Sequence, residues 1–298
     1  MSEAPFIDVM LPFYGDAAHF RAAVESVRAQ DHPHWRLVCV DDAHPDPSTG
    51  RWLESLQDPR IEYHRNAENL GVARNFNRCL GLVTAPYFVM MGGDDLMRPD
   101  YLSTVAAAAL RHPQAALIQP GVAVIDDDGR PALPLADRIK AVLRRANGTG
   151  DRLLRGEQLA TTLTRADWAY FPSLLWRTDA VAPIGFDETW DIALDLALIL
   201  ELAIEDQAMF VTDHVCFDYR RHRASASSAA AHDGERFAQE KAFFAAYGAR
   251  FAAMGWRTAA RIARMHVVSR LNAVTALPRA IAQRDRRSVG RLLRHVIA

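Results

Sequence analysis

The sequence has few cysteines, no long apolar run and almost no net charge. Its three cysteines, Cys39, Cys79 and Cys216, lie far apart without a CxxC pair, so we expect neither a zinc site nor a disulfide framework. No apolar stretch approaches the roughly 20 residues that cross a bilayer, and the N-terminus lacks a basic segment followed by an apolar core. The sequence therefore predicts a cytoplasmic protein with reduced thiols.

The sequence lacks the motifs and the charge that mark several classes of function. The formal net charge of -1 gives no global electrostatic case for binding nucleic acid. No GxxxxGK, GxGxxG or GxSxG motif follows a predicted strand, which argues against a P-loop NTPase, a dinucleotide oxidoreductase and an α/β-hydrolase. The length of 298 residues allows one large domain, or one domain with an appendage.

The first 120 residues alternate short apolar runs with helical patterns, which predicts an α/β fold with a parallel sheet covered by helices. Loops that follow the strands then share one edge of the sheet, where ligands bind in such folds. The predicted strands are Phe6–Leu11, Trp35–Val40, Ile61–His64, Tyr87–Met91 and Ala115–Gln119, and the predicted helices are Ala17–Gln30, Thr49–Leu56, Gly71–Leu82 and Pro99–Arg111.

Residues 126–156 mix turn residues with charge, and we expect a mobile or variable excursion there. Order returns with an apolar run at 170–176, and the aromatic residues of 168–176 either pack in the core or stack on a ring of a ligand. A helix at 192–205 and a strand at 208–212 follow. Further helices are predicted at 234–253, 257–275 and 279–296.

Polar residues end the first three strands. Pro12 and Tyr14 follow the first strand and form a wall suited to a flat base. Asp41 and Asp42 end the second, where a carboxylate accepts hydrogen bonds from a ribose or a base; the alternative is that one of them caps the following turn. The turn at Asn69 opens a helix bearing Arg74, placed to meet an anionic ligand, although a helical arginine is often only solvated.

The fourth strand is followed by Gly92, Gly93, Asp94 and Asp95. The glycines allow a ligand to approach the backbone closely. Carboxylates favour Mg²⁺ and Mn²⁺, and these ions neutralise a diphosphate leaving group. The pattern predicts a divalent cation site and a nucleotide donor.

Together these segments resemble glycosyltransferase family 2, which has the GT-A fold. The resemblance implies a Rossmann-like, mostly parallel sheet, a nucleotide-sugar donor, inversion at the sugar, and Mn²⁺ or Mg²⁺ on Asp94. One departure is Gly92, which stands where the family has the first acid of a Leu-Asp-x-Asp-Asp motif. The matching segments are Pro12–Gly15, Asp41–Asp42, Asn69–Asn75 and Gly92–Pro99.

Two later segments extend the resemblance. Gly185–Leu202 is similar to a Gly-Phe-Asp-Glu turn and a helix bearing the general base, which places Asp195 at the base position with Asp191 as the competing candidate. The alternative is that Asp191 caps the helix and Asp195 is an exposed acid on it. Asp218–Ser227 is similar to a Tyr-Arg-x-His segment, which implies His222 near the metal or diphosphate and Arg220 as an anion contact. The implied donor-binding set is Pro12, Tyr14, Asp41, Asp42, Asn69, Arg74, Asp95 and Arg220.

The implied function is transfer of a sugar to a hydroxyl of a saccharide or a lipid-linked acceptor. A different class stays open: a catalytically degenerate nucleotide-sugar-binding or scaffold protein, because Gly92 and Leu194 replace two acids common in the family. A nucleotidyltransferase would need a basic Gly-rich loop near the first strand, which is missing. The expected organisation is a catalytic domain at 1–232, with a nucleotide-sugar half at 1–125 and an acceptor half at 126–232, and a helical extension at 233–298.

The end of the chain is strongly basic. From Arg257 to Ala298 there are ten arginines and one acid, Asp285, and the apolar residues recur at helical spacing. Two alternatives follow. The helices pack on the catalytic domain or form a homodimer seam, or they lie on the anionic inner face of a membrane and bring the site to a lipid-linked acceptor.

Overall fold

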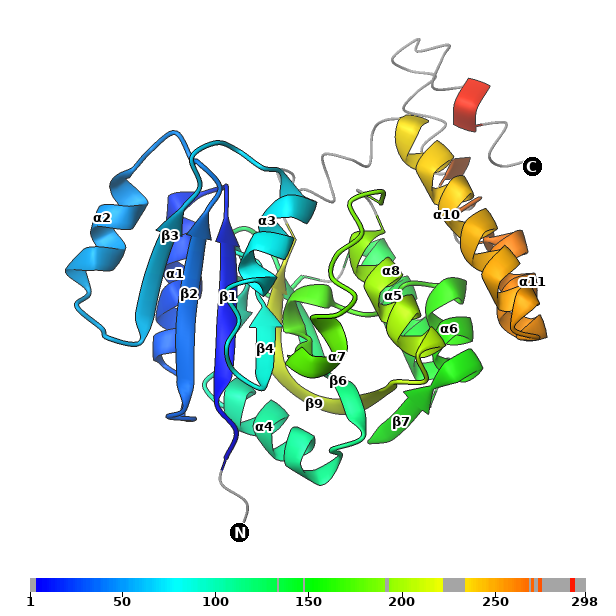
Figure 1. Ribbon diagram of the computed structural model, residues 1–298, viewed down its shortest axis with the longest axis horizontal. Helices are drawn as coiled ribbons and strands as arrows, with labels where there is room; N and C mark the ends of the chain where they lie inside the picture. Colours follow the sequence, from blue (N-terminus) through cyan, green and yellow to red (C-terminus); the bar gives the residue numbers. More distant parts are fainter. Residues whose placement is uncertain are drawn as a thin grey trace.

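The computed structural model describes residues 4–132, 134–146, 148–190, 193–221, 234–267, 269–270, 273–274 and 290–292. They form a nine-stranded sheet with helices on both faces and a pair of C-terminal helices along one side (Figure 1). The strand order is β3-β2-β1-β4-β8-β6-β9-β5, with β7 beside β9. Within the described residues, no helix has the length and apolar character needed to cross a membrane.

The first half of the sheet is the predicted parallel unit. β1 pairs in parallel with β2 and β4, and β3 lies outside β2. Every predicted element before residue 112 is confirmed, with ends that differ by a few residues. The strands are β1 Ile7–Phe13, β2 Trp35–Asp41, β3 Ile61–Arg65 and β4 Tyr87–Met90, and the helices are α1 Ala17–Arg28, α2 Ser48–Ser55, α3 Val72–Leu80 and α4 Tyr101–Arg111.

Both faces of this half-sheet are buried, because alternate residues of a strand face opposite sides. Ile7, Val9 and Leu11 of β1 pack in a core with α1 and α4. Met10 belongs to the other core, which contains residues of α3, α6 and α8. Parallel strands covered on both faces have continuous apolar sequences, as β1 and β2 do.

The second half of the sheet mixes strand directions. β8 runs antiparallel to β4 and β6, whereas β6 and β9 are parallel. β9 is far longer than the predicted strand at 208–212 and continues through Arg220. The elements are β5 Leu96–Met97, β6 Ala115–Ile125, α6 Gly156–Arg165, the 3₁₀ turn Phe171–Ser173, β8 Leu175–Arg177, α7 Thr178–Val181, α8 Leu194–Ile204 and β9 Ala208–Arg220.

The segment at 126–156, expected to be a mobile or variable excursion, contains regular secondary structure that its sequence did not predict. A helix, α5 (Leu135–Ala146), and a strand, β7 (Arg152–Arg155), lie within it. β7 pairs with β9, with Leu154 opposite Met209. The sequence signal is weak because β7 has four residues, and its partner strand lies more than 50 positions later in the chain.

The C-terminal helices pack on the same core. α10 (Gly234–Ala253) contributes Phe243, Tyr247 and Phe251 to the core that includes α8. α11 (Arg257–Met265) lies beside α10 and against α6, as Figure 1 shows. The carboxylate of Glu157 on α6 accepts the N–H groups of Thr258 and Ala259, and so caps the first turn of α11. The predicted helix at 279–296 lies largely outside the described residues.

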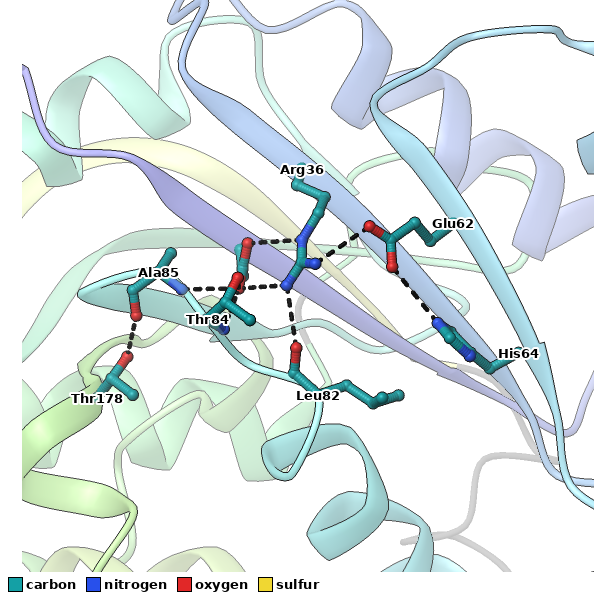
Figure 2. A network of polar contacts seen from close by, with 8 residues as sticks. Arg36, Glu62, His64, Leu82, Thr84, Ala85 and Thr178 are labelled. Carbon is teal, nitrogen blue, oxygen red and sulfur yellow. Dashed lines mark hydrogen bonds and ion pairs between the residues drawn. The ribbon is translucent and has the colours of Figure 1, made fainter.

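A buried carboxylate joins the strands at the opposite end from their carboxyl edge (Figure 2). Asp8 on β1 is fully buried and accepts two hydrogen bonds from Arg36 on β2, at 3.0 and 2.7 Å. It also accepts the N–H groups of Thr84 and Ala85, which precede β4. Arg36 continues the network to Glu62 on β3. Four neighbouring segments are therefore held by one charged cluster.

Candidate active site

The predicted meeting of the strand ends at one edge is confirmed. The backbone N–H of Asp42, after β2, donates to the carbonyl of Phe13 at the end of β1, at 2.9 Å. A Cβ on Gly93, after β4, would lie 3.5 Å from the carbonyl oxygen of Pro12. The segments after β1, β2 and β4 are thus in close contact.

Asp42 organises the loop that leads to α3. Its Oδ1 accepts the Asn66 side-chain amide and the N–H of Leu70, and its Oδ2 accepts the N–H of Gly71 at 3.0 Å. Asn66 also donates to Oδ1 of Asn75 in α3. These contacts fix the start of α3 against the end of β2. A role for Asp42 toward a ribose stays a prediction.

Asp41 caps the turn after β2, which was the alternative considered for this pair. Its Oδ1 accepts the N–H of His44 at 2.7 Å. Its Oδ2 accepts both the Tyr63 hydroxyl and a guanidinium N–H of Arg65, each at 2.6 Å. Asp41 is 1% exposed, so these three bonds satisfy a buried charge.

Tyr14 and Asn69 lie at the surface of this edge. The Tyr14 side chain is 58% exposed, and its ring meets the His44 ring edge-on at 5.7 Å. Asn69 is exposed, and its side-chain oxygen accepts the N–H of Gly71 within the turn before α3. Pro12 is partly buried. Tyr14 is therefore accessible as a wall for a flat ligand, and a role in binding stays a prediction for all three residues.

The N-terminal turns of α3 are tied to the second half of the chain. Nε of Arg74 lies 3.0 Å from a carboxylate oxygen of Glu188. Asn77 exchanges two hydrogen bonds with the backbone of Phe186, at 2.9 and 2.8 Å. The turn at 185–188 precedes α8, so these contacts bring the predicted donor-binding helix beside the segment that leads to Asp195.

Asp94 and Asp95 converge on Gly92. A Cβ at position 92 would lie 2.5 Å from Oδ2 of Asp95 and 2.9 Å from Oδ1 of Asp94. Asp95 is 1% exposed; its Oδ1 accepts the N–H of Arg220 at 2.8 Å, whereas its Oδ2 has no hydrogen-bond partner among the described residues. Burial, and then the charge of Asp94, raise the pKa of Asp95 well above its usual range.

Arg220, at the end of β9, donates hydrogen bonds to backbone carbonyl groups of two loops. Its Nε donates to the carbonyl of Asp94 at 2.7 Å, and its Nη1 donates to those of Asp126 and Asp127. The residue is 5% exposed. Arg220 therefore joins the loop after β4 to the loop after β6, and its predicted role as an anion contact stays a prediction.

Asp195 lies in the first turn of α8 and is partly buried. Its carboxylate accepts the N–H of Leu196 at 2.8 Å. Burial, and then the charge of Asp167, raise the pKa of Asp195 to about 7. Asp167 precedes the segment at 168–176, and its buried Oδ1 has no hydrogen-bond partner in the described ranges. A carboxyl group of this pKa is suited to accept a proton near neutral pH.

Several residues important to the edge carry no sequence signal of their own. Asn66 and Asp167 are not predicted, because their contacts are with residues far along the chain, whereas Glu188 belongs to the Gly-Phe-Asp-Glu turn but has no predicted role. Trp168 and Trp176 are 1% and 0% exposed, so core packing accounts for them rather than stacking on an acceptor. Asp191 and His222 lie outside the described residues.

Comparison with known protein families identifies the family to which this chain belongs. The family model described as "Glycosyl transferase family 2" matches residues 8–171, which include every strand end discussed above except that of β9. The chain belongs to glycosyltransferase family 2. The family assignment based on the sequence motifs is confirmed.

Two curated glycosyltransferases are similar to the family 2 region of this chain. The putative colanic acid biosynthesis glycosyl transferase WcaA of Escherichia coli is 29% identical over 108 residues, which are 36% of this chain and 39% of that protein. The putative teichuronic acid biosynthesis glycosyltransferase TuaG of Bacillus subtilis is 32% identical over 100 residues, which are 33% of this chain and 39% of that protein. The chain therefore spans about two fifths of the length of these relatives.

A solved family structure supports the fold. TarS of S. aureus, residues 1–349 in complex with UDP-GlcNAc, aligns with a TM-score of 0.62 and 15% identity over 80% of this chain and 66% of that chain. The same fragment without that ligand aligns with a TM-score of 0.59. These alignments confirm the predicted GT-A fold with its mostly parallel central sheet.

A divalent cation fits this family 2 site through its carboxylates. No group of three or more His, Cys, Asp or Glu side chains is placed to hold a metal among the residues that the structure describes. Asp94 and Asp95 nevertheless converge, and the buried Oδ2 of Asp95 has no hydrogen-bond partner among those residues. Mg²⁺ held with substrate phosphates uses one or two protein carboxylates, so this pair is sufficient.

Proposed function

We propose that this chain is an inverting glycosyltransferase that moves a sugar from a nucleoside diphosphate to an acceptor hydroxyl. The observation that carries the proposal is the arrangement at the carboxyl edge of the sheet. Two carboxylates converge after β4, and a carboxyl group with a pKa near neutrality stands at the start of α8. The contacts of α3 with the 185–188 turn bring the segment that leads to α8 to the predicted donor-binding helix.

The donor would lie along the ends of β1, β2 and β4. Pro12 and Tyr14 would flank the base, and Asp41, Asp42 and Asn69 would supply acceptors or shape the loops for the base and ribose. Arg74 would contact an anionic part of the donor. A divalent cation held by Asp94, with His222, would neutralise the charge of the departing diphosphate. The UDP-GlcNAc complex of TarS supports a nucleotide-sugar donor.

Asp195 would act as the general base. It would accept the proton of the acceptor hydroxyl while the oxygen attacks the anomeric carbon opposite the leaving diphosphate, and a single displacement inverts that carbon. Its pKa of about 7 matches a base that works near neutral pH. Asp191 remains the competing candidate for this role.

The acceptor would be a saccharide or a lipid-linked saccharide of the cell envelope. The names of WcaA and TuaG, which refer to colanic acid and teichuronic acid biosynthesis, support this class. We place the acceptor half at 126–232 and the donor half at 1–125, with α5 and the segment at 168–176 on the acceptor side. The region 233–298 would be a helical extension of this catalytic domain.

The alternative is a nucleotide-sugar-binding or scaffold protein without activity, supported by Gly92 and Leu194 in place of two family acids. Screening UDP-, GDP- and dTDP-sugars, with and without Mn²⁺, separates the two. An enzyme hydrolyses one donor slowly and transfers its sugar when an acceptor is added. A scaffold gains thermal stability from the donor but leaves it intact.

A further inference from the structure

The loop after β4 holds its carboxylates in an arrangement that depends on a missing side chain. Gly92 stands where the family motif begins with an acid, and the position that its Cβ would take is 2.5 Å from Oδ2 of Asp95. Real side chains do not approach this closely. Asp95 and any side chain at position 92 therefore compete for one space.

The geometry points to Asp95 as a second carboxylate of this site: we propose that Asp94 and Asp95 together bind the divalent cation, with Oδ2 of Asp95 in the space that a side chain at position 92 would fill. This inference rests on the cation site of the proposed function. Oδ1 of Asp95 is held by the N–H of Arg220, so the side chain has a fixed orientation. Oδ2 is the atom left for a cation.

The observation that favours a bound cation at this site is the environment of Oδ2 of Asp95. A buried carboxylate oxygen without a donor is costly unless a cation or a proton reaches it. Asp95 is 1% exposed, and within the part of the chain that the structure describes its Oδ2 has no hydrogen-bond partner, although Oδ1 has one. Oδ1 of Asp94 approaches the same Cβ position to 2.9 Å. A hard cation takes carboxylate oxygens together with phosphate oxygens, which is the set that this pair and a diphosphate provide.

The test measures Mn²⁺ binding by electron paramagnetic resonance, with Mn²⁺ alone and with UDP, on the full chain. Asp95→Asn should weaken Mn²⁺ binding at least tenfold. Gly92→Ala should also weaken it, because the methyl group displaces the Asp95 carboxylate without removing a charge. Asp100→Asn, which removes a surface carboxylate paired with His214, is the matched control and should change nothing.

The decisive variant restores the family acid. Gly92→Asp combined with Asp95→Asn should recover the Mn²⁺ binding that Asp95→Asn loses, because the two acids occupy one space. Thermal melting confirms that each variant is folded. Suppose that Asp94→Asn abolishes Mn²⁺ binding. Unchanged Mn²⁺ affinity in folded Asp95→Asn, or no recovery in the double variant, then overturns the role of Asp95 but not the cation site. Absence of Mn²⁺ binding by the unaltered chain overturns the cation site as a whole.

A second observation concerns the outer face of α11. Arg257, Arg261 and Arg264 recur at helical spacing and line a shallow groove of about 560 Å³ with Met265. All three are exposed, and among the described residues no ion pair joins them to an acid. Ala259 and Ala263 on the opposite face of α11 are buried, and Ala260 is buried beside the groove itself.

We infer that this arginine face binds the anionic surface of a phospholipid membrane. An exposed apolar side chain lines the groove with the charges, Met265 at 40%, and Met254 and Val267, which lie just before and just after α11 in the chain, are 41% and 52% exposed. Arginines beside exposed apolar groups are the composition of helices that lie in the headgroup region of a bilayer. This surface would hold the chain at the side of the membrane where a lipid-linked acceptor is available.

Co-sedimentation of the full chain with vesicles tests this surface. Binding to phosphatidylcholine vesicles containing phosphatidylglycerol should fall roughly 100-fold in the Arg257→Gln/Arg261→Gln/Arg264→Gln variant, since each charge near such a surface contributes about 1 kcal/mol. The control variant Arg51→Gln/Arg138→Gln/Arg165→Gln has the same net charge and should bind normally. Three outcomes would overturn the inference. The first is an equal loss of vesicle binding in both variants, and the second is equal binding of the unaltered chain to purely neutral vesicles. The third is a dimer in gel filtration that only the substitutions in α11 dissociate.

Discussion

Nε of Arg74 lies 3.0 Å from Oε2 of Glu188, across 114 positions of sequence, so the helix proposed to bind the donor contacts the turn that leads to the proposed base. Both side chains are largely exposed, at 67% and 50%. Exposed ion pairs contribute at most about 1 kcal/mol to folding. The pair is therefore suited to exchange partners when an anionic ligand binds.

Arg74→Gln should weaken UDP binding by roughly tenfold or more, because a charge-assisted hydrogen bond to the donor is lost. Glu188→Gln should leave UDP affinity unchanged or increase it, since it frees the guanidinium. Isothermal titration calorimetry measures both. If the two substitutions weaken binding equally, the ion pair itself matters and Arg74 does not contact the donor.

Asp195→Asn should lower kcat by roughly 10²- to 10⁴-fold with little change in donor affinity, because a general base acts in the transition state. In the unaltered enzyme, kcat/KM should rise with pH and level off above about 7, where the Asp195 carboxyl is ionised. Asp191→Asn is the control. An inactive Asp191→Asn beside an active Asp195→Asn would transfer the role to Asp191.

Asp167→Asn should move the acidic limb of that pH profile to lower pH. The charge of Asp167 is, after burial, the main cause of the raised pKa of Asp195, so removing it lets Asp195 ionise more readily. The measurement is kcat/KM against pH for both enzymes. An unshifted limb with normal kcat would show that Asp167 does not affect the reacting carboxyl.

The carboxyl group of Asp195 also makes the free energy of unfolding depend on pH. The pKa of Asp195 is about 7 when folded and near the ordinary value of 3.8 when unfolded, so the unfolded chain loses this proton first. The contribution of Asp195 to the free energy of unfolding is therefore full below about pH 4 and falls as pH rises to about 7. Asp195→Asn should melt higher than the unaltered chain at pH 8 by roughly 3 °C or more, and the two should converge near pH 4. Equal melting temperatures at pH 8 would contradict the shifted pKa.

Asp8→Ala should destabilise the chain by roughly 3–5 kcal/mol, because it leaves Arg36 without its buried partner and two backbone N–H groups without an acceptor. Glu62→Gln in the same network should cost at most about 1 kcal/mol, since Glu62 is 43% exposed. Urea denaturation measures both. A similar cost for the two substitutions would mean that the Asp8 cluster adds no more stability than a surface ion pair.

Elements with strong local patterns were predictable from the sequence. β1, β2 and α1 combine apolar periodicity with clear ends, such as Asp16, which caps α1 through the N–H groups of Ala18 and His19. α5, β7 and the second part of β9 were not. β7 and β9 are stabilised by pairing such as that of Leu154 with Met209, and no local pattern reports a strand partner that is distant along the chain.

The sequence by itself determined the family and the edge of the sheet at which its polar motifs meet, because strand ends follow from periodicity and parallel strands end at one edge. Only the tertiary structure decided what each carboxylate does there. Asp41 and Asp42 hold loops, Asp95 turns one oxygen to Arg220 and the other toward Gly92, and Asp195 gains Asp167 as a neighbour. Hydrogen-bond partners, burial and neighbouring charge set the chemistry of a carboxyl group, and all three depend on residues that folding brings from elsewhere in the chain.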